Sequence, residues 1–594
     1  MSLVKTSIAA FAVASAALGS LLAPAPATAN DIVINMAAPD WLPTRFMQEE
    51  FDRSYKSKSG NNVKLVIDFI PWGSFYQRVA ASLSSGEKKY QMIVTDSQWL
   101  GDFVEGGHYL KLNKYIDADP ELQAVMADMH PVLKSTSSSY PYKSTNYYGF
   151  PQFPDNLVTA YRKDLFCNPT ERANFQKQFN QVLPCYYNEW EDVDWDRYEN
   201  IGKFFQRKKG DKLGDGVADD DFYGIAYQMG KPYDFSSMQA NGFIWEAGGD
   251  IWDETSTKPA LGVVNSDTAV KAFDHYLSLG KYMPPVAKTG QMDIFVVQDL
   301  YMQGKVAAIV DWVGVMGPVI NPKLSKVADK SEFAEPPGTR KPDGSISRWS
   351  NIGGQPFVLT TWNNDEVIKE SLDIVKWWMS KDTQIKFVKA GGQSGLLSVM
   401  NDPAYASWAP YNRAYLDNYR WQKDVWHIPE FFPLLTEQQE QFDKAITGQV
   451  SGKEALDTVA AFQDKLLREA GRIKSRLKQE TWSRSTLSGG FIPTRPARAT
   501  QARRLLVSHT ARVPHDDNRK SPGDRRGDQR RGGTQALAER HGFPGLDADS
   551  GAARTLAYRA RYRDAVHREH ISLDVVLRAQ FLRIQGQSYC GPCF

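Results

Sequence analysis

The chain has 594 residues, a formal net charge of +2 at pH 7, 42% hydrophobic residues and 12% aromatic residues. This length indicates more than one domain. After the N-terminal segment, no stretch is long and apolar enough to span a bilayer, which excludes a bundle of membrane-spanning helices.

The first 29 residues have the pattern of a secretory signal peptide. Lys5 supplies the positive charge, residues 8–22 are apolar and rich in alanine, and Ala27-Thr28-Ala29 fits the small-residue cleavage rule. The apolar run is short for a membrane span, and prolines follow it. We therefore expect cleavage near Ala29 and export to the periplasm. Because no cysteine follows the apolar run, no lipid anchor is expected.

The body of the chain then alternates short apolar runs with amphipathic stretches. This order of strand and helix predicts a mainly parallel sheet with both faces covered. Helices are expected to end at Gly60 and Gly86. The predicted strands are 31–38, 63–70 and 90–96, and the predicted helices are 45–60, 73–86 and the stretch after residue 99.

A second α/β series follows from residue 156 onwards. Two such series predict two lobes with a cleft between them, which is the usual place for a ligand. The predicted strands are 156–162, 222–229, 306–312 and 355–362. The predicted helices are 236–249, 267–280, 298–303, one or two between 365 and 392, 435–448 and 452–475.

The four cysteines form two pairs in the sequence. In an exported protein, Cys167 and Cys185 are close enough to suggest a disulfide that closes a surface loop. Cys590-Gly-Pro-Cys593 resembles a thioredoxin redox motif. However, only Phe594 follows it, so the required helix cannot form and we interpret the match as a coincidence.

The C-terminal tail, residues 476–594, differs in composition from the body. Up to Ser475 there are 36 Lys and 13 Arg, whereas the tail has 2 Lys and 20 Arg. The tail is polar and shows no sustained period, so it is expected to be disordered. It is either a basic arm for nucleic acid or an anionic membrane, or the product of reading a gene out of frame. We favour the second interpretation and expect no nucleic-acid partner.

Five segments in order resemble family 1 of the bacterial extracellular solute-binding proteins, the group that includes maltose-binding proteins. The first, 90–116, resembles the family's strand, turn and helix, which in the family ends in Gly-x-Leu-x-x-Leu. The second contains a Gly-x-Pro segment before an apolar strand and Tyr-x-x-Asp-Leu-Phe. The segments are 90–116, 147–166, 243–254, 295–312 and 353–388.

The resemblance implies a two-lobed periplasmic binding protein fold with hinge-connected α/β lobes. It assigns 30–150, with a return segment near 350–400, to the first lobe. It assigns 151–349, with helices near 401–475, to the second. It also implies that a sugar or polyol binds between the lobes and is delivered to the permease of an ATP-driven (ABC) importer. No catalysis and no cofactor are implied, and we expect a monomer.

A sugar site needs flat aromatic surface for the C–H face of the ring and polar groups for its hydroxyls. The loops after the first three predicted strands contain such residues, and ligands bind at the carboxyl ends of strands in open α/β sheets. The candidates in these loops are Trp41, Trp72, Asp96, Ser97 and Trp99.

Further candidates come from the crossing between the lobes and from the second lobe. By resemblance, Asp155 falls near a position where the family often places a sugar-binding acid. The adjacent glycines 353 and 354 would let a backbone approach the ligand closely. The candidates in these segments are Gln152, Asp155, Trp245, Glu246, Asp311, Trp312, Gly354 and Gln355.

Other interpretations of these residues stay open. The tryptophans could be core packing, and Asp96 and Asp155 could be helix caps. A secreted glycoside hydrolase could use two of Asp96, Asp155 and Glu246 as its acid and nucleophile. The acidic loop around Gly216 has Leu213 and Phe222 where a calcium loop needs oxygen ligands, so no metal site is expected.

Overall fold

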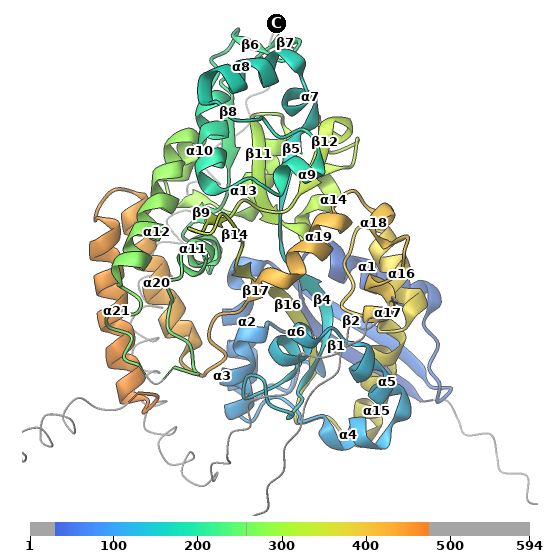
Figure 1. Cartoon of the computed structure of the whole chain (residues 1–594). Coiled ribbons are helices and arrows are strands. Elements are labelled where there is room, and N and C mark those ends of the chain that lie inside the picture. Colours follow the sequence, from blue (N-terminus) through green and yellow to red (C-terminus); the bar gives the residue numbers. More distant parts are fainter. Residues whose placement is uncertain (1–29, 257, 474–594) are drawn as a thin grey trace, which may run out of the picture. The chain divides into compact units, whose positions relative to one another are not determined.

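The computed structural model describes residues 30–256 and 258–473. The predicted signal peptide and the Arg-rich tail lie outside the described residues. The described residues form two main β-sheets, each covered by its own helices (Figure 1). This arrangement confirms the predicted two α/β lobes.

The first lobe is built on a five-stranded sheet with the order β2-β1-β3-β16-β4. The first three strands of the chain run parallel, as predicted. Only β16, which returns from the second lobe, runs antiparallel to both of its neighbours. The strands are β1 (Asp31–Pro39), β2 (Asn62–Ile70), β3 (Met92–Val94), β4 (Gly149–Asp155) and β16 (Gly353–Leu359).

Two helices of this lobe, α2 and α3, end directly before a glycine. Gly86 caps α2 in the left-handed conformation with a φ of 73°, as predicted. The prediction for α1 was wrong, because this helix ends at Ser54 and Gly60 lies in the following turn. The helices are α1 (Leu42–Ser54), α2 (Trp72–Ser85), α3 (Leu100–Glu105), α4 (Asn113–Ala118), α5 (Pro120–Asp128), α6 (Pro131–Leu133), α15 (Asp365–Trp378), α16 (Lys381–Lys389) and α17 (Leu397–Met400).

The second lobe is built on a four-stranded sheet with the order β12-β5-β11-β8. Here the reversed strand is β5, the first strand after the crossing from the other lobe. The strands are β5 (Leu157–Arg162), β8 (Tyr223–Ala226), β11 (Val306–Trp312) and β12 (Ser331–Ala334). Short pairs are formed by β6 (Lys212–Leu213) with β7 (Gly216–Val217), β9 (Met229–Gly230) with β10 (Gln291–Met292), β13 (Thr339–Arg340) with β14 (Ile346–Ser347) and β15 (Ser350–Asn351) with β17 (Gln422–Lys423).

The helices of the second lobe include segments far apart in the sequence. Figure 1 shows α20 and α21, in orange, beside α12, in green. Phe273 and Phe442 join α12 to α20, with ring centroids 4.2 Å apart. The remaining helices are α7 (Lys163–Phe166), α8 (Pro169–Phe179), α9 (Tyr187–Trp190), α10 (Trp195–Phe204), α11 (Phe235–Glu246), α12 (Asp267–Leu279), α13 (Ile294–Met302), α14 (Met316–Val319), α18 (Tyr405–Trp408), α19 (Asn412–Asn418), α20 (Phe431–Ile446) and α21 (Gly452–Glu469).

The first connection between the two sheets is a single residue, Asn156, which separates β4 from β5. The Asn156 side chain donates a hydrogen bond to the backbone oxygen of Tyr415, 3.0 Å away. The chain returns before β16, where β15 pairs in parallel with β17. The lobes are therefore joined by short extended segments. The exact lobe boundaries near residues 150 and 350 stay a prediction.

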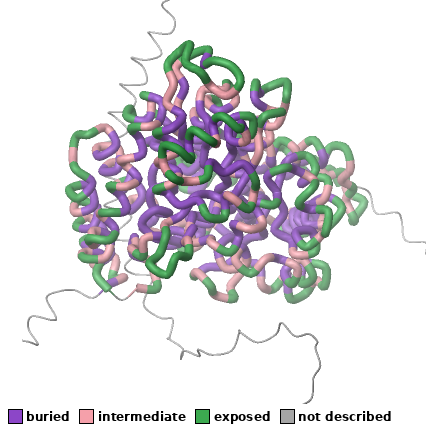
Figure 2. Tube along the Cα trace, turned by 45° about the horizontal axis from the view of Figure 1, so that its top comes forward, coloured by how far each residue is buried: buried purple, intermediate pink, exposed green. Residues whose placement is uncertain are grey.

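Buried residues run through both sheets and the inner faces of the helices. Figure 2 shows them in purple in the interior, with exposed loops in green on the outside. Trp378 on α15 is fully buried. Helix α11 is buried over its whole length, because α12 and α20 both pack against it. This burial fixes the first turn of α11 beside the cavity described below.

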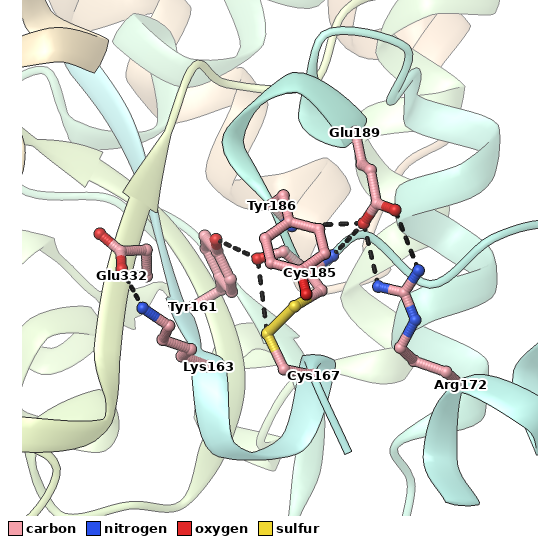
Figure 3. The surroundings of a disulfide bond; sticks show 8 residues. All are labelled: Tyr161, Lys163, Cys167, Arg172, Cys185, Tyr186, Glu189 and Glu332. Atoms are coloured by element: carbon pink, nitrogen blue, oxygen red, sulfur yellow. Dashed lines mark hydrogen bonds and ion pairs between the residues drawn. A yellow bond between two sulfur atoms is a disulfide. The ribbon is translucent and has the colours of Figure 1, made fainter. Parts of the chain in front are cut away.

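Cys167 and Cys185 form the expected disulfide, with an S–S distance of 2.02 Å. Arg172, in the connection between them, forms a salt bridge of 2.9 Å with Glu189, which follows Cys185 (Figure 3). Glu189 also accepts a hydrogen bond from the Cys185 amide, and the Tyr161 hydroxyl donates to the Cys185 carbonyl oxygen. The disulfide thus closes a segment that is already bonded to the second sheet.

Replacing both cysteines by serine should lower the free energy of unfolding by about 3 kcal/mol, because the open chain gains conformational entropy when it unfolds. The bridged residues are 18 apart. Denaturant titration of the mature chain measures the change. Reductant should weaken the wild-type protein but not the double variant. Equal stability of the two proteins without reductant would contradict a stabilising disulfide.

Candidate functional site

A cavity lies where the two lobes meet. Both lobes and the return segment contribute to its wall, so a solute inside it would touch all three. The lining residues are Trp41, Trp72, Asp96, Gln98, Phe153 and Asp155 from the first lobe, Asp234, Phe235, Met238, Ile294, Trp312, Gly314 and Val315 from the second, and Ile352, Gly353 and Gln355 from the return segment.

The first-lobe wall comes from the carboxyl ends of three neighbouring parallel strands. Trp41 follows β1, Trp72 begins α2 just after β2, and Asp96 follows β3. Because β1 lies between β2 and β3 in the sheet, the three residues meet at one edge. This convergence is the one that the sequence predicts.

Three indoles form a stack at this edge. Trp72 lies between Trp41, with ring centroids 5.0 Å apart, and Trp99, with ring centroids 5.9 Å apart. Both contacts are nearly parallel, so both faces of Trp72 are covered by protein. Trp72 therefore offers a ring edge to the cavity, and Trp99 is buried behind it. Trp41 and Trp312 remain as the indoles that can offer a face.

Asp96 is both a helix cap and a cavity residue. Its carboxylate accepts a hydrogen bond from the amide of Gln98 at the start of the 3-10 turn Ser97–Trp99. Burial, together with the nearby carboxylates of Asp424 and Asp234, raises the pKa of Asp96 well above its usual value. The capping and cavity interpretations of this residue are thus compatible.

Asp155 joins the end of β4 to the second lobe. The amide of Gly314 donates to both carboxylate oxygens of Asp155, at 3.0 and 3.2 Å. A Cβ at position 314 would lie 2.6 Å from the Asp155 carboxylate, so a larger residue there would displace the Asp155 side chain. Burial raises the pKa of Asp155 well above its usual value, although the amide bonds oppose the rise.

Asp234 is a third acid in the cavity, and it comes from the second lobe just before α11. Burial raises its pKa to about 7, and a hydrogen bond from the Trp72 indole opposes the rise. This bond crosses between the lobes. The preceding residue, Tyr233, has a φ of 49°, and its hydroxyl accepts a bond from the Trp99 indole.

Several polar atoms of the lining have no hydrogen-bond partner among the described residues. They are the indole Nε1 of Trp41 and the amide oxygens of Gln98 and Gln355. A solute hydroxyl could accept from the indole and donate to the amide oxygens. Among the described residues that line the cavity there is no Lys, Arg or His. The wall is therefore suited to an uncharged solute with many hydroxyls.

The structure places about half of the predicted site residues outside this lining. Strand alternation explains Gln152 and Gly354. The adjacent residues Phe153 and Gln355 line the cavity, and successive residues of a strand point to opposite faces of the sheet. Trp99 lies behind Trp72, and Ser97 turns toward Asp424. The predicted residues outside the lining are Ser97, Trp99, Gln152, Trp245, Glu246, Asp311 and Gly354.

The second-lobe members of this group belong to the interior of that lobe. Trp245 lies two turns along α11 from the cavity and donates to Asp250, 3.2 Å away. Glu246 accepts from the indole of Trp195 and the hydroxyl of Thr339. The Asp311 side chain is buried against Gln228, 3.1 Å away. Glu246 therefore cannot be a catalytic acid of this cavity.

Sequence reasoning missed the apolar part of the wall. Phe235 and Met238 lie on the first turn of a helix that is buried on all sides, so no periodicity marks them. Asp234 could have been found from its place directly before that helix. The residues that were missed are Phe153, Asp234, Phe235, Met238, Ile294, Gly314, Val315 and Ile352.

One cluster outside the cavity has ligand atoms suitable for a metal ion. Asp196, Glu199 and His275 bring such atoms within 4.8 Å of one another. However, Glu199 also pairs with Lys203 at 3.1 Å and Lys281 at 3.4 Å. These lysines already balance the negative charge, so the cluster has the properties of a surface ion-pair network.

The family model of the bacterial extracellular solute-binding proteins matches residues 39–385. A mannitol-binding protein of Pseudomonas aeruginosa is 27% identical over 346 residues, which are 55% of this chain and 70% of that protein. The chain belongs to the bacterial extracellular solute-binding protein family, as the resemblance predicts.

Solved structures show the same fold. A ribitol complex of a solute-binding protein from Agrobacterium radiobacter K84 has a TM-score of 0.58 at 18% identity, covering 73% of this chain and 98% of that one. A D-mannitol complex from Agrobacterium vitis S4 has a TM-score of 0.57 at 20% identity, covering 74% and 99%. None of the helices in the described part of the chain is both long and apolar enough to cross a membrane.

Replacing Asp234 by asparagine should stabilise the protein above pH 7. With a folded pKa of about 7, Asp234 is still protonated in the folded state at pH values where the unfolded state has lost that proton. The folded state therefore loses stability as pH rises, by about 4 kcal/mol once Asp234 has ionised. The variant lacks this loss, and the two proteins should converge near pH 4.

Denaturant titrations at several pH values measure this difference. Asp329, which is exposed, is the matched control, and its replacement by asparagine should leave the pH profile unchanged. A wild-type protein as stable as the Asp234→Asn variant at pH 8 would show that the Asp234 carboxyl group is not held in a desolvated site.

Proposed function

We propose that this protein binds a polyol or small sugar in the cavity between its lobes and delivers it to the permease of an ABC importer. The observation that carries the proposal is the composition of the cavity wall. It combines indoles, three carboxyl groups and two amide oxygens in a chain of the solute-binding family. Export to the periplasm and action as a monomer belong to the same proposal.

The wall matches a polyhydroxy solute group by group. Trp41 and Trp312 offer apolar surface to C–H groups. The acids Asp96, Asp155 and Asp234 can each hydrogen-bond to hydroxyls, and burial strengthens such bonds. A linear polyol has hydroxyls along its whole length, so it can reach acids on both lobes at once.

Ligand binding is coupled to lobe closure in this proposal. The lobes already contact each other around the cavity through Trp72 with Asp234 and through Asp155 with Gly314. A solute that touches both lobes adds contacts that an open form lacks. It therefore shifts the population toward the closed form by its difference in affinity for the two forms.

The related proteins indicate which solutes to try first. Their names and bound ligands are mannitol, ribitol and, in MalE3 of T. maritima at 18% identity and a TM-score of 0.57, maltose. The alternative, a secreted glycoside hydrolase, would need two suitably spaced acids in the same cavity. Two of the three candidate acids, Asp96 and Asp155, line the cavity. Both carboxylate oxygens of Asp155 already accept from the Gly314 amide, which leaves Asp96 as the less restrained of the two.

D-mannitol, ribitol and maltose should be titrated into residues 30–473 by calorimetry. We expect at least one of them to bind without turnover, and Trp312→Ala to weaken that binding at least tenfold because an aromatic platform is lost. Trp408→Ala is the matched control, since Trp408 lies on α18 outside the cavity lining. Hydrolysis of maltose, or equal effects of the two variants, would contradict the proposal.

The cavity should also discriminate against negative charge. D-mannonate differs from D-mannitol by a carboxylate, which would be buried beside acids with no basic residue in the described lining. We expect D-mannonate to bind at least tenfold more weakly than D-mannitol at pH 8. The Asp234→Asn variant should reduce this difference in affinity. Competition against the best ligand of the calorimetric panel measures both. Equal affinities for the acid and the polyol would show that acids on the wall do not set selectivity.

A further inference from the structure

A buried chain of polar groups connects the cavity to a segment behind it. The Ser97 hydroxyl lies 3.2 Å from a carboxylate oxygen of Asp96 and 2.9 Å from one of Asp424. The same oxygen of Asp424 lies 2.8 Å from Nε2 of His427. All four residues are buried. Among them only Asp96 lines the cavity.

This row of polar groups, Asp96, Ser97, Asp424 and His427, brings together three segments that are distant in the sequence. Asp96 and Ser97 follow β3 in the first lobe, whereas Asp424 and His427 follow β17. On the far side, Glu254 follows α11 of the second lobe and lies 3.7 Å from Nδ1 of His427. The His427 segment also packs tightly on the first lobe. A Cβ on Gly101 of α3 would lie 2.4 Å from the His427 carbonyl oxygen.

The proton count of this chain points to a protonated Asp96. A serine hydroxyl has one proton, and the shorter contact assigns it to Asp424. The Ser97 hydroxyl then has no second proton for the Asp96 oxygen 3.2 Å away, so an ionised Asp96 would lack this donor beside a second buried acid. Nε2 of His427 lies 2.8 Å from Asp424, which raises the pKa of His427 above its usual value and so favours a protonated ring beside that carboxylate.

We propose that Asp424, which Ser97 links to Asp96 and which His427 holds in place, is a positioning residue that keeps a proton on the cavity acid Asp96 while the lobes are closed. A neutral Asp96 can lie close to Asp234 and to the ligand without repulsion. Loss of its proton would place a second charge next to Asp424 and favour the open form. The effect on ligand affinity rests on the function proposed above, whereas the effect on the protein alone does not.

Other charged and titratable groups that face His427 are few. They are Asp424, Glu254 and, through Coulomb interaction, Asp96, while the ring of Tyr142 packs at 4.8 Å. Burial lowers the pKa of His427, but Asp424 outweighs it and raises the pKa above its usual value. No Lys or Arg is among the groups that act on His427, so His427 is the group that supplies positive charge to this row of polar residues.

Two substitutions should move the pH dependence in opposite directions. Asp424→Asn removes a negative neighbour, so Asp96 should lose its proton at a pH about one unit lower. His427→Gln removes a positive neighbour, so Asp96 should keep its proton to a higher pH. His275→Gln is the control, because His275 is a half-buried histidine on α12 that lies outside this set of polar contacts. It should leave the profile unchanged.

The first measurement is the melting temperature of residues 30–473 between pH 5 and 9 without any solute. The second is the affinity for D-mannitol over the same range. Opposite shifts of the melting profile support the proposal, and shifts in the same direction or none at all overturn it. If one variant does not fold, the shift in the other decides alone. If D-mannitol fails to bind while the melting profiles shift, the proposed ligand is wrong and the positioning role stands.

Discussion

The hydrogen bond between the Gly314 amide and the Asp155 carboxylate joins the two lobes at the shortest connection between them. Asp155 is the last residue of β4, and one residue later the chain has entered the second sheet. Because the bond takes up the carboxylate at the crossing, the strand ends of both sheets are held facing each other. The cavity, its indoles and its other acids all lie around this junction.

The acids near the junction are costly to bury, and the structure offsets this cost in different ways. Asp155 receives backbone amides, and Asp234 receives the Trp72 indole from the opposite lobe. Asp96 is beside a second buried acid whose charge a histidine balances. Each solution uses a group from another segment of the chain. The polar wall therefore depends on several segments of the chain being assembled together.

The sequence predicts the parts of this site that depend on local order. Strands that alternate with helices place Trp41, Trp72 and Asp96 at one edge, whatever the rest of the chain does. Which of the other residues line the cavity depends on how side chains and helices pack against one another. Whether Trp99 or Trp72 reaches the cavity depends on which indole is stacked behind the other. Phe235 and Met238 are found only once α12 and α20 have buried the remaining faces of α11. The ligand contacts of these residues stay predictions.

The stacked indoles of Trp41, Trp72 and Trp99 also affect how the protein interacts with light. Their centroids are 5.0 and 5.9 Å apart, close enough for the electronic transitions of neighbouring rings to couple. Trp72 and Trp99 also contact Tyr233 of the opposite lobe edge-on. Separation of the lobes changes the surroundings of two coupled rings at once. The protein thus carries a built-in optical signal of its own conformation, readable in circular dichroism or fluorescence without any added label.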